Sequence, residues 1–225
     1  MHINKHILFT FFVPLGLLLS ACGGGSGGEG SSSSLKSVPT AKPTSTQNQA
    51  FPRAAVVAQT DASAFVDASG VSGLTYSCGI EARKTLTNGV FNCSQFPIDF
   101  FLGNLNLGTV NSISLNNKIF TTDLLLQARD ASRHPVVSNV SMLLQSLDED
   151  SNLQNGITIT QTIINATNQY FYADTNISTM STAEMNLAIS DIIQTLADST
   201  PSVFLTQVNT QDAQDNLTAS IALAK

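Results

Sequence analysis

The chain has 225 residues, of which 42% are hydrophobic, 7% aromatic and 12% charged, and it contains no Trp. This length allows one or two domains, and the apolar content suffices for one modest core and is too high for a wholly disordered chain. The 10 basic and 16 acidic residues give a net charge of −6, and basic residues nowhere form a run. We therefore exclude nucleic acid as a partner, because its phosphates need clustered Lys and Arg.

The N-terminal segment, residues 1–21, has the pattern of an export signal. A weakly positive start containing Lys5 is followed by an apolar run from Ile7 to Leu19. This run is shorter than the about 20 residues that a membrane-spanning helix needs. We interpret it as the hydrophobic region of a signal peptide.

The apolar run ends in Leu19-Ser20-Ala21-Cys22, which resembles the bacterial lipobox. The resemblance implies cleavage before Cys22 and acylation of its thiol by fatty acids such as palmitate. An ordinary secretory signal is the alternative. Gly23 stands where an inner-membrane lipoprotein has Asp, so the sorting rule of such lipoproteins implies an anchor in the outer membrane.

Residues 22–60 form the lipidated Cys and a tether rich in Gly, Ser, Pro and Thr. Such a composition buries too little apolar surface to offset the entropy of the chain. A flexible Gly/Ser coil of this length has a root-mean-square reach of roughly 35 Å. We expect it to hold the following domain clear of the membrane surface.

Residues 61–225 are predicted to form one compact α+β domain, with a β part at about 61–120 and a helical part at about 121–225. The β part has two turn signals between extended segments. Asn88-Gly89 favours a type I′ turn and predicts a hairpin over residues 85–91. Gly103-Asn104 predicts a second hairpin over residues 98–107, with Phe100, Leu102, Leu105 and Leu107 facing the core.

Cys78 and Cys93 lie on either side of the first predicted turn, and they are the only thiols left once Cys22 is acylated. Export to an oxidising compartment favours a disulfide between them. A loop of this length stabilises the fold by about 3 kcal/mol in the chain-entropy model. A metal pair and a redox pair are the alternatives, and both lack companion ligands and the C-x-x-C spacing.

This part of the chain resembles a small β-module of adhesin-like surface lipoproteins from Gram-negative bacteria. The resemblance rests on Phe65–Asp67, Val71–Gly79 and Asn88–Phe91. In that family a helical segment often follows, and Leu143–Asp150 with Asn155–Ile157 resembles it. The resemblance covers most of residues 64–160 and implies an exported, surface-associated protein without assigned catalytic residues.

The period of the apolar residues changes from two to about 3.6 after Thr122. A helix is predicted from Pro135, with an apolar face at Val136, Val140, Leu143, Leu144 and Leu147. A second begins at the capping box Ser181–Glu184 and carries Met185, Ile189, Ile192, Ile193 and Leu196 on one face. A third begins near Asn209 and carries Ala213, Leu217 and Ile221. We expect these helices to pack against each other and the sheet, because each has one apolar face.

Asp148, Asp150 and Asn152 place oxygen ligands at alternate positions, as calcium loops do. The run departs from an EF-hand, because Leu153 replaces the turn glycine and Ile159 replaces the bidentate Glu. A solvated acidic turn is the alternative. Calcium is thus the one candidate cofactor.

Catalysis is not predicted. His134 is the one imidazole outside the signal segment, no G-x-S-x-G motif is present, and the proline after His134 favours a turn at the start of a helix. Tyr76, Tyr170, Phe171 and Tyr172 are expected to pack in the core, with a small aromatic contact patch as the alternative.

We therefore expect a non-enzymatic, outer-membrane-anchored lipoprotein that binds an unknown protein or glycan. Two alternatives remain open: an accessory lipoprotein for envelope or pilus assembly that faces the periplasm, and a hydrolase with an unrecognised Ser/Asp site.

Overall fold

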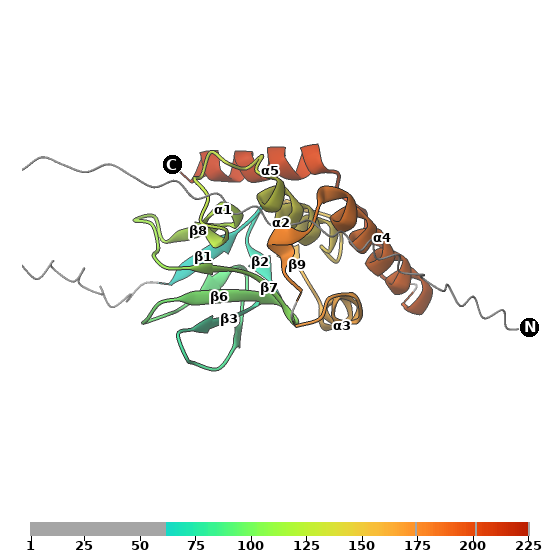
Figure 1. Ribbon diagram of the computed structural model, residues 1–225, viewed down its shortest axis with the longest axis horizontal. Coiled ribbons are helices and arrows are strands. Elements are labelled where there is room, and N and C mark those ends of the chain that lie inside the picture. Colours follow the sequence, from blue (N-terminus) through green and yellow to red (C-terminus); the bar gives the residue numbers. More distant parts are fainter. Residues whose placement is uncertain (1–61, 174, 201, 225) are drawn as a thin grey trace, which may run out of the picture. The chain divides into compact units, whose positions relative to one another are not determined.

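The computed structural model describes residues 62–173, 175–200 and 202–224, which form a mixed α+β fold (Figure 1). The predicted signal segment, Cys22 and the tether lie outside the described residues. The strands are β1 (Ser63–Val66), β2 (Val71–Ser72), β3 (Thr75–Cys78), β4 (Lys84–Thr85), β5 (Val90–Phe91), β6 (Ile98–Leu102), β7 (Leu105–Val110), β8 (Lys118–Phe120) and β9 (Ile157–Thr158). The helices are α1 (Thr121–Leu124), α2 (Pro135–Ser146), α3 (Gln161–Tyr170), the 3-10 helix η1 (Ile177–Thr179), α4 (Thr182–Ser199) and α5 (Thr210–Leu223).

The largest sheet is antiparallel, with strand order β4-β3-β6-β7. It confirms the predicted hairpin at Gly103-Asn104, where β6 turns into β7 and Leu102 pairs with Leu105. Gly103 takes a φ of 57°, which costs a glycine little. The four apolar side chains expected to face the core, Phe100, Leu102, Leu105 and Leu107, are all fully buried.

The turn at Asn88-Gly89 forms, but the hairpin predicted around it is limited to one antiparallel bridge, between Thr87 and Val90. Asn88 and Gly89 have φ values of 52° and 77°, and the Val90 amide donates to the Thr87 carbonyl at 2.9 Å. The strands on either side then part, since β4 pairs with β3 and β5 pairs with β1. Strands β4 and β5 therefore pair with strands farther away in the sequence instead of with each other.

Two parallel strand pairs join segments that are far apart in the sequence. β1 lies between β5 and β8 and pairs with β8 in parallel, and β2 pairs in parallel with β9. Gly73, just after β2, has a φ of 90°, and a Cβ there would lie 1.9 Å from the carbonyl oxygen of Ile159. The absence of a side chain at Gly73 therefore allows the chain after β9 to approach β2.

The predicted disulfide between Cys78 and Cys93 is confirmed. Their Cα atoms are 5.6 Å apart, and both residues are buried. Cys78 ends β3, and Cys93 follows β5, which belongs to another sheet. The bond therefore links the four-stranded sheet to the segment after β5.

Three of the helices begin where the sequence predicts. Pro135 is the first residue of α2, where its missing N–H costs no hydrogen bond. Ser181 and Glu184 form the capping box of α4, and the Asn209 side chain caps α5 by accepting from the Asp212 amide at 2.9 Å. Helix α3 was not predicted, because its sequence QTIINATNQY is mostly polar and it has no side-chain cap.

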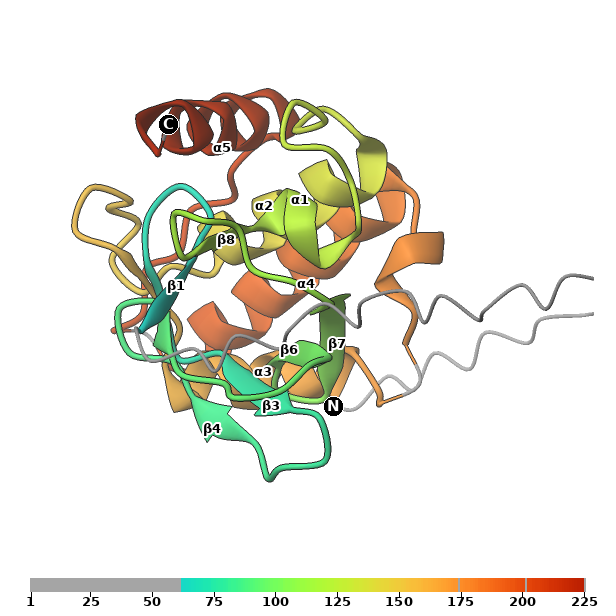
Figure 2. The same ribbon diagram turned by 90° about the vertical axis from the view of Figure 1, so that its left-hand side faces the viewer.

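Helix α2 lies at the centre of the helical part and contacts both α4 and α5 (Figures 1 and 2). In both views α5 lies on the side of α2 away from β3. Buried residues of the strands and of α2, α3 and α4 belong to one continuous hydrophobic cluster. The β and helical parts therefore share a core, which confirms the predicted α+β fold class.

Asp67, which follows β1, is a fully buried carboxylate in this fold. Ser141 and Gln145 of α2 donate to its Oδ1 at 2.8 and 2.6 Å, and Thr121 of α1 donates to its Oδ2. Burial raises the pKa of Asp67, and these hydrogen bonds oppose the rise.

Candidate functional site

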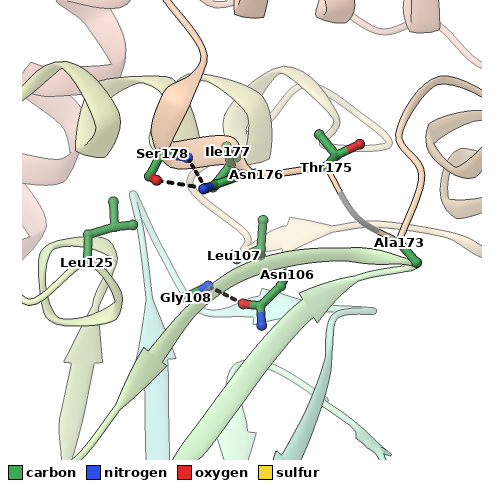
Figure 3. Close-up of a pocket in the computed structure, with 9 residues that line it drawn as sticks. All are labelled: Asn106, Leu107, Gly108, Leu125, Ala173, Thr175, Asn176, Ile177 and Ser178. Atoms are coloured by element: carbon green, nitrogen blue, oxygen red, sulfur yellow. Dashed lines mark hydrogen bonds between the residues drawn. The ribbon is translucent and has the colours of Figure 1, made fainter.

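A pocket of about 340 Å³ lies between β7 and the segment that leads into η1 (Figure 3). Strand β7 contributes three consecutive residues, and Leu125 follows α1 on another side. The described lining consists of Asn106, Leu107, Gly108, Leu125, Ala173, Thr175, Asn176, Ile177 and Ser178. Leu107 and Ile177 are buried and form an apolar base, whereas Asn106, Asn176 and Ser178 are exposed.

Two asparagine side chains of this pocket are held by their own neighbours. The Asn106 Oδ1 accepts from the Gly108 amide at 2.8 Å. The Asn176 Oδ1 accepts from the Ser178 amide at 3.0 Å and from the Ser178 hydroxyl at 2.7 Å. Figure 3 shows Asn106 and Leu107 leaving β7 in opposite directions, as expected for consecutive strand residues.

Each of these amides therefore has its oxygen occupied and its nitrogen available. Within the described residues, neither the Asn106 Nδ2 nor the Asn176 Nδ2 donates a hydrogen bond. The described lining also contains no charged residue, His or Cys. The two asparagines offer hydrogen-bond donors above an apolar base, and such donors can bind hydroxyl or carbonyl oxygens of a ligand.

Sequence reasoning did not identify this pocket. Its only sequence signal is the spacing in Asn106-x-Gly108 and Asn176-x-Ser178, in which an Asn side chain accepts from the backbone two residues later. The same spacing occurs in ordinary turns. The approach of η1 to β7 is a tertiary contact that local sequence does not encode.

His134, the imidazole considered for catalysis, lies away from this pocket. His134 is exposed and is the residue before α2, as its place before Pro135 predicts. Among the described residues, no side chain hydrogen-bonds to its imidazole. The Ser178 hydroxyl in the pocket donates to an amide oxygen, and no base accepts its proton.

The four aromatic residues do not form one contact patch. Tyr76 packs against Phe91 and Phe100 in the core, with ring centroids 5.7 and 6.4 Å apart. Tyr170 and Phe171 contact each other at 5.1 Å, and Phe171 is buried. The expectation of core packing holds for Tyr76 and Phe171, whereas Tyr172 is 68% exposed.

The predicted acidic run lies in the loop between α2 and β9. Asp148 is only 1% exposed and accepts from the Thr158 amide at 2.8 Å. The exposed Asp150 accepts from the Asn152 amide at 3.0 Å and from the Asn155 side chain at 2.8 Å. In the part of the chain that the structure describes, no group of three or more His, Cys, Asp or Glu residues is arranged to hold a metal ion.

No family model, curated protein or solved structure matches this chain. Among the described helices, none combines the length and the apolar character that crossing a membrane requires.

Proposed function

We propose that this protein is a non-enzymatic binding lipoprotein, anchored in the outer membrane through Cys22. Its adhesin-like domain would recognise an uncharged group on a protein or a glycan. The observation that carries the proposal is the pocket beside β7, whose described lining is uncharged and includes two fixed asparagines with amide nitrogens available as donors. A hydrolase would need a nucleophile next to a base, and the described pocket lining has no such pair.

The disulfide supports export, because such bonds persist in oxidising compartments and are rare in the cytosol. The lipobox at Leu19–Cys22 supports anchoring by lipid. Both features support the proposal that the pocket belongs to a domain outside the cytoplasm, which residues 22–60 would tether.

Binding is tested by incubating the full chain with an array of neutral oligosaccharides and uncharged peptides. We expect selective binding to a few members, and its loss in Asn106→Asp and Asn176→Asp, since a carboxylate replaces a donor by an acceptor. Asn165→Asp on α3 is the matched control, because it adds the same charge at an exposed Asn outside the pocket. Equal binding by all three variants would refute the role of this pocket.

Anchoring is tested by Cys22→Ser, which should move the protein from the detergent phase to the aqueous phase. An unchanged detergent partition would refute the lipoprotein proposal. Protease treatment of intact cells then distinguishes a domain at the cell surface from a domain that faces the periplasm. Release of the domain supports an adhesin-like role at the surface, and protection supports the accessory role in the periplasm.

A further inference from the structure

The chain contains two Asn-Gly dipeptides, Asn88-Gly89 and Asn155-Gly156. Asn is one of the chemically least durable residues in proteins. Its side-chain amide is most open to attack by the next backbone nitrogen when that residue is glycine, because no Cβ hinders the approach. Both asparagines are exposed, but the structure gives the two glycine nitrogens different surroundings.

The Gly89 nitrogen is held in place by the fold. Gly89 is buried, its amide donates to the Val71 carbonyl at 2.8 Å, and its carbonyl accepts from the Phe65 amide at 2.8 Å. The Asn88 amide also donates to the Ser72 hydroxyl at 2.8 Å. The turn must therefore open before the Gly89 nitrogen can reach the Asn88 side chain.

The Gly156 nitrogen has no such restraint. Within the described part of the chain its amide donates no hydrogen bond, and Gly156 lies partly exposed in the loop between α2 and β9. Its φ of 114° is a conformation that glycine adopts readily. The side chain of Asn155 makes one hydrogen bond, from its Nδ2 to the Asp150 Oδ2 at 2.8 Å.

We propose that Asn155 is a site of spontaneous deamidation, with the Gly156 nitrogen as the nucleophile. This nitrogen forms a bond to the Asn155 Cγ, the Cγ–Nδ2 bond breaks, and the proton from the Gly156 amide leaves with Nδ2 as ammonia. The product is a succinimide ring. Water then adds to one of the two ring carbonyls and opens the ring, which yields aspartate or isoaspartate at position 155.

The reaction converts an attraction in this loop into a repulsion. The hydrogen bond from Asn155 to Asp150 is lost, and a new carboxylate faces the carboxylate of Asp150. The ion pairs of the described residues provide no basic partner for Asp150. Two like charges in contact repel each other, most strongly at low ionic strength.

The isoaspartate product also changes the main chain, because it adds a methylene group to the backbone just before β9. There the Ile157 amide donates to the Gly70 carbonyl at 3.0 Å, and Ile157 pairs with Val71 of β2. Deamidation of Asn155 therefore loosens the junction of β9 with β2. Since ammonia is released, the change is one-way and accumulates with the age of the protein.

The experiment incubates the full chain at mildly alkaline pH and follows the peptides around Asn88 and Asn155 by mass spectrometry after digestion. We expect a gain of about one dalton and isoaspartate at Asn155, at least about tenfold faster than at Asn88. In urea the two rates should become similar, since both glycine nitrogens are then free. Asn155→Gln is the matched control, because it keeps the amide but closes a ring far more slowly, and it should show no gain at this position.

Three results overturn the proposal: no gain at Asn155, equal rates at the two sites in the folded chain, or a tenfold difference that persists in urea. In the last case the flanking residues, and not the fold, set the rates.

The effect on the loop is tested with Asn155→Asp, which has the charge of the product and an unchanged backbone. It should lower the melting temperature by about 1 to 2 °C at low ionic strength, and by less at high ionic strength. In a chain that also carries Asp150→Asn, the same substitution should leave the melting temperature unchanged. Equal effects of Asn155→Asp with and without Asp150→Asn would refute the repulsion.

Discussion

The side-chain amide of Gln145 donates a 2.6 Å hydrogen bond to the carboxylate of Asp67, a residue 78 positions earlier in the chain. Asn216 of α5 in turn donates to the Gln145 Oε1 at 2.9 Å. The end of β1, the central helix α2 and the outer helix α5 are therefore joined through one buried polar network. Among the described ion pairs none includes Asp67, so hydrogen bonds alone stabilise its charge.

Asp67→Ala should lower the free energy of unfolding by about 3 kcal/mol, because buried donors on Thr121, Ser141 and Gln145 lose their acceptor. Urea titration followed by circular dichroism measures this change. Asp191→Ala, at an exposed position of α4, is the control and should change stability by less than about 0.5 kcal/mol. Similar losses in the two variants would contradict a structural role for the network.

Asp67 should also make stability depend on pH. Its folded-state pKa is raised by burial, so as pH increases the unfolded chain loses this proton first. The contribution of Asp67 to stability is therefore complete below its unfolded pKa and is lost as pH rises through its folded pKa.

The variant Asp67→Asn isolates the contribution of Asp67 to this pH dependence, because an amide side chain does not titrate. The stability of this variant relative to the wild type should increase as pH rises above about 4, the usual pKa of an unfolded Asp, as measured by urea unfolding. A stability difference that stays constant over this range would show that Asp67 has the same pKa in both states.

Removing the disulfide with Cys78→Ser and Cys93→Ser should cost about 3 kcal/mol, the chain-entropy value for a 15-residue separation. Denaturant unfolding measures the loss. The wild-type chain with reductant should lose a similar amount, which controls for the two serines. Full alkylation of both cysteines in the native protein without reductant would contradict the bond.

Ser181→Ala should destabilise the fold by about 1 kcal/mol, because the Ser181 hydroxyl accepts from the Glu184 amide at the start of α4. Thermal unfolding provides the measurement. Ser199→Ala, at the exposed C-terminal end of the same helix, is the comparison and should have a smaller effect. Equal shifts at both ends would argue against a capping contribution.

Features determined by neighbouring residues were predictable from the sequence. Pro135 fixes the start of α2 because its lost N–H has no partner at that position, and Ser181 with Glu184 fixes the start of α4. Gly103-Asn104 forms its hairpin because both flanking segments can pair with each other. The Cys78–Cys93 pair followed from the shortage of other thiols in an exported chain.

Features that depend on distant segments were not predictable. The turn at Asn88-Gly89 forms, yet β5 pairs with β1 and not with β4, the strand before the turn. A solvated turn, the alternative to a calcium site, describes the exposed Asp150 but not Asp148, which is 1% exposed and accepts a hydrogen bond from the Thr158 amide of β9. The pocket beside β7 depends on the contact between η1 and β7, and neither Asn106 nor Asn176 carries a sequence signal of that contact.

The pairing of Val71 with Ile157 sets the order in which the fold can be completed. A nascent chain emerges with its N-terminus first, so β2 cannot pair with β9 until most of the polypeptide has been made. Fragments that end after β8 lack β9, α2 and the buried partners of Asp67. We therefore expect that the β part does not fold as a separate module, because it shares its core and the hydrogen bonds of Asp67 with α2.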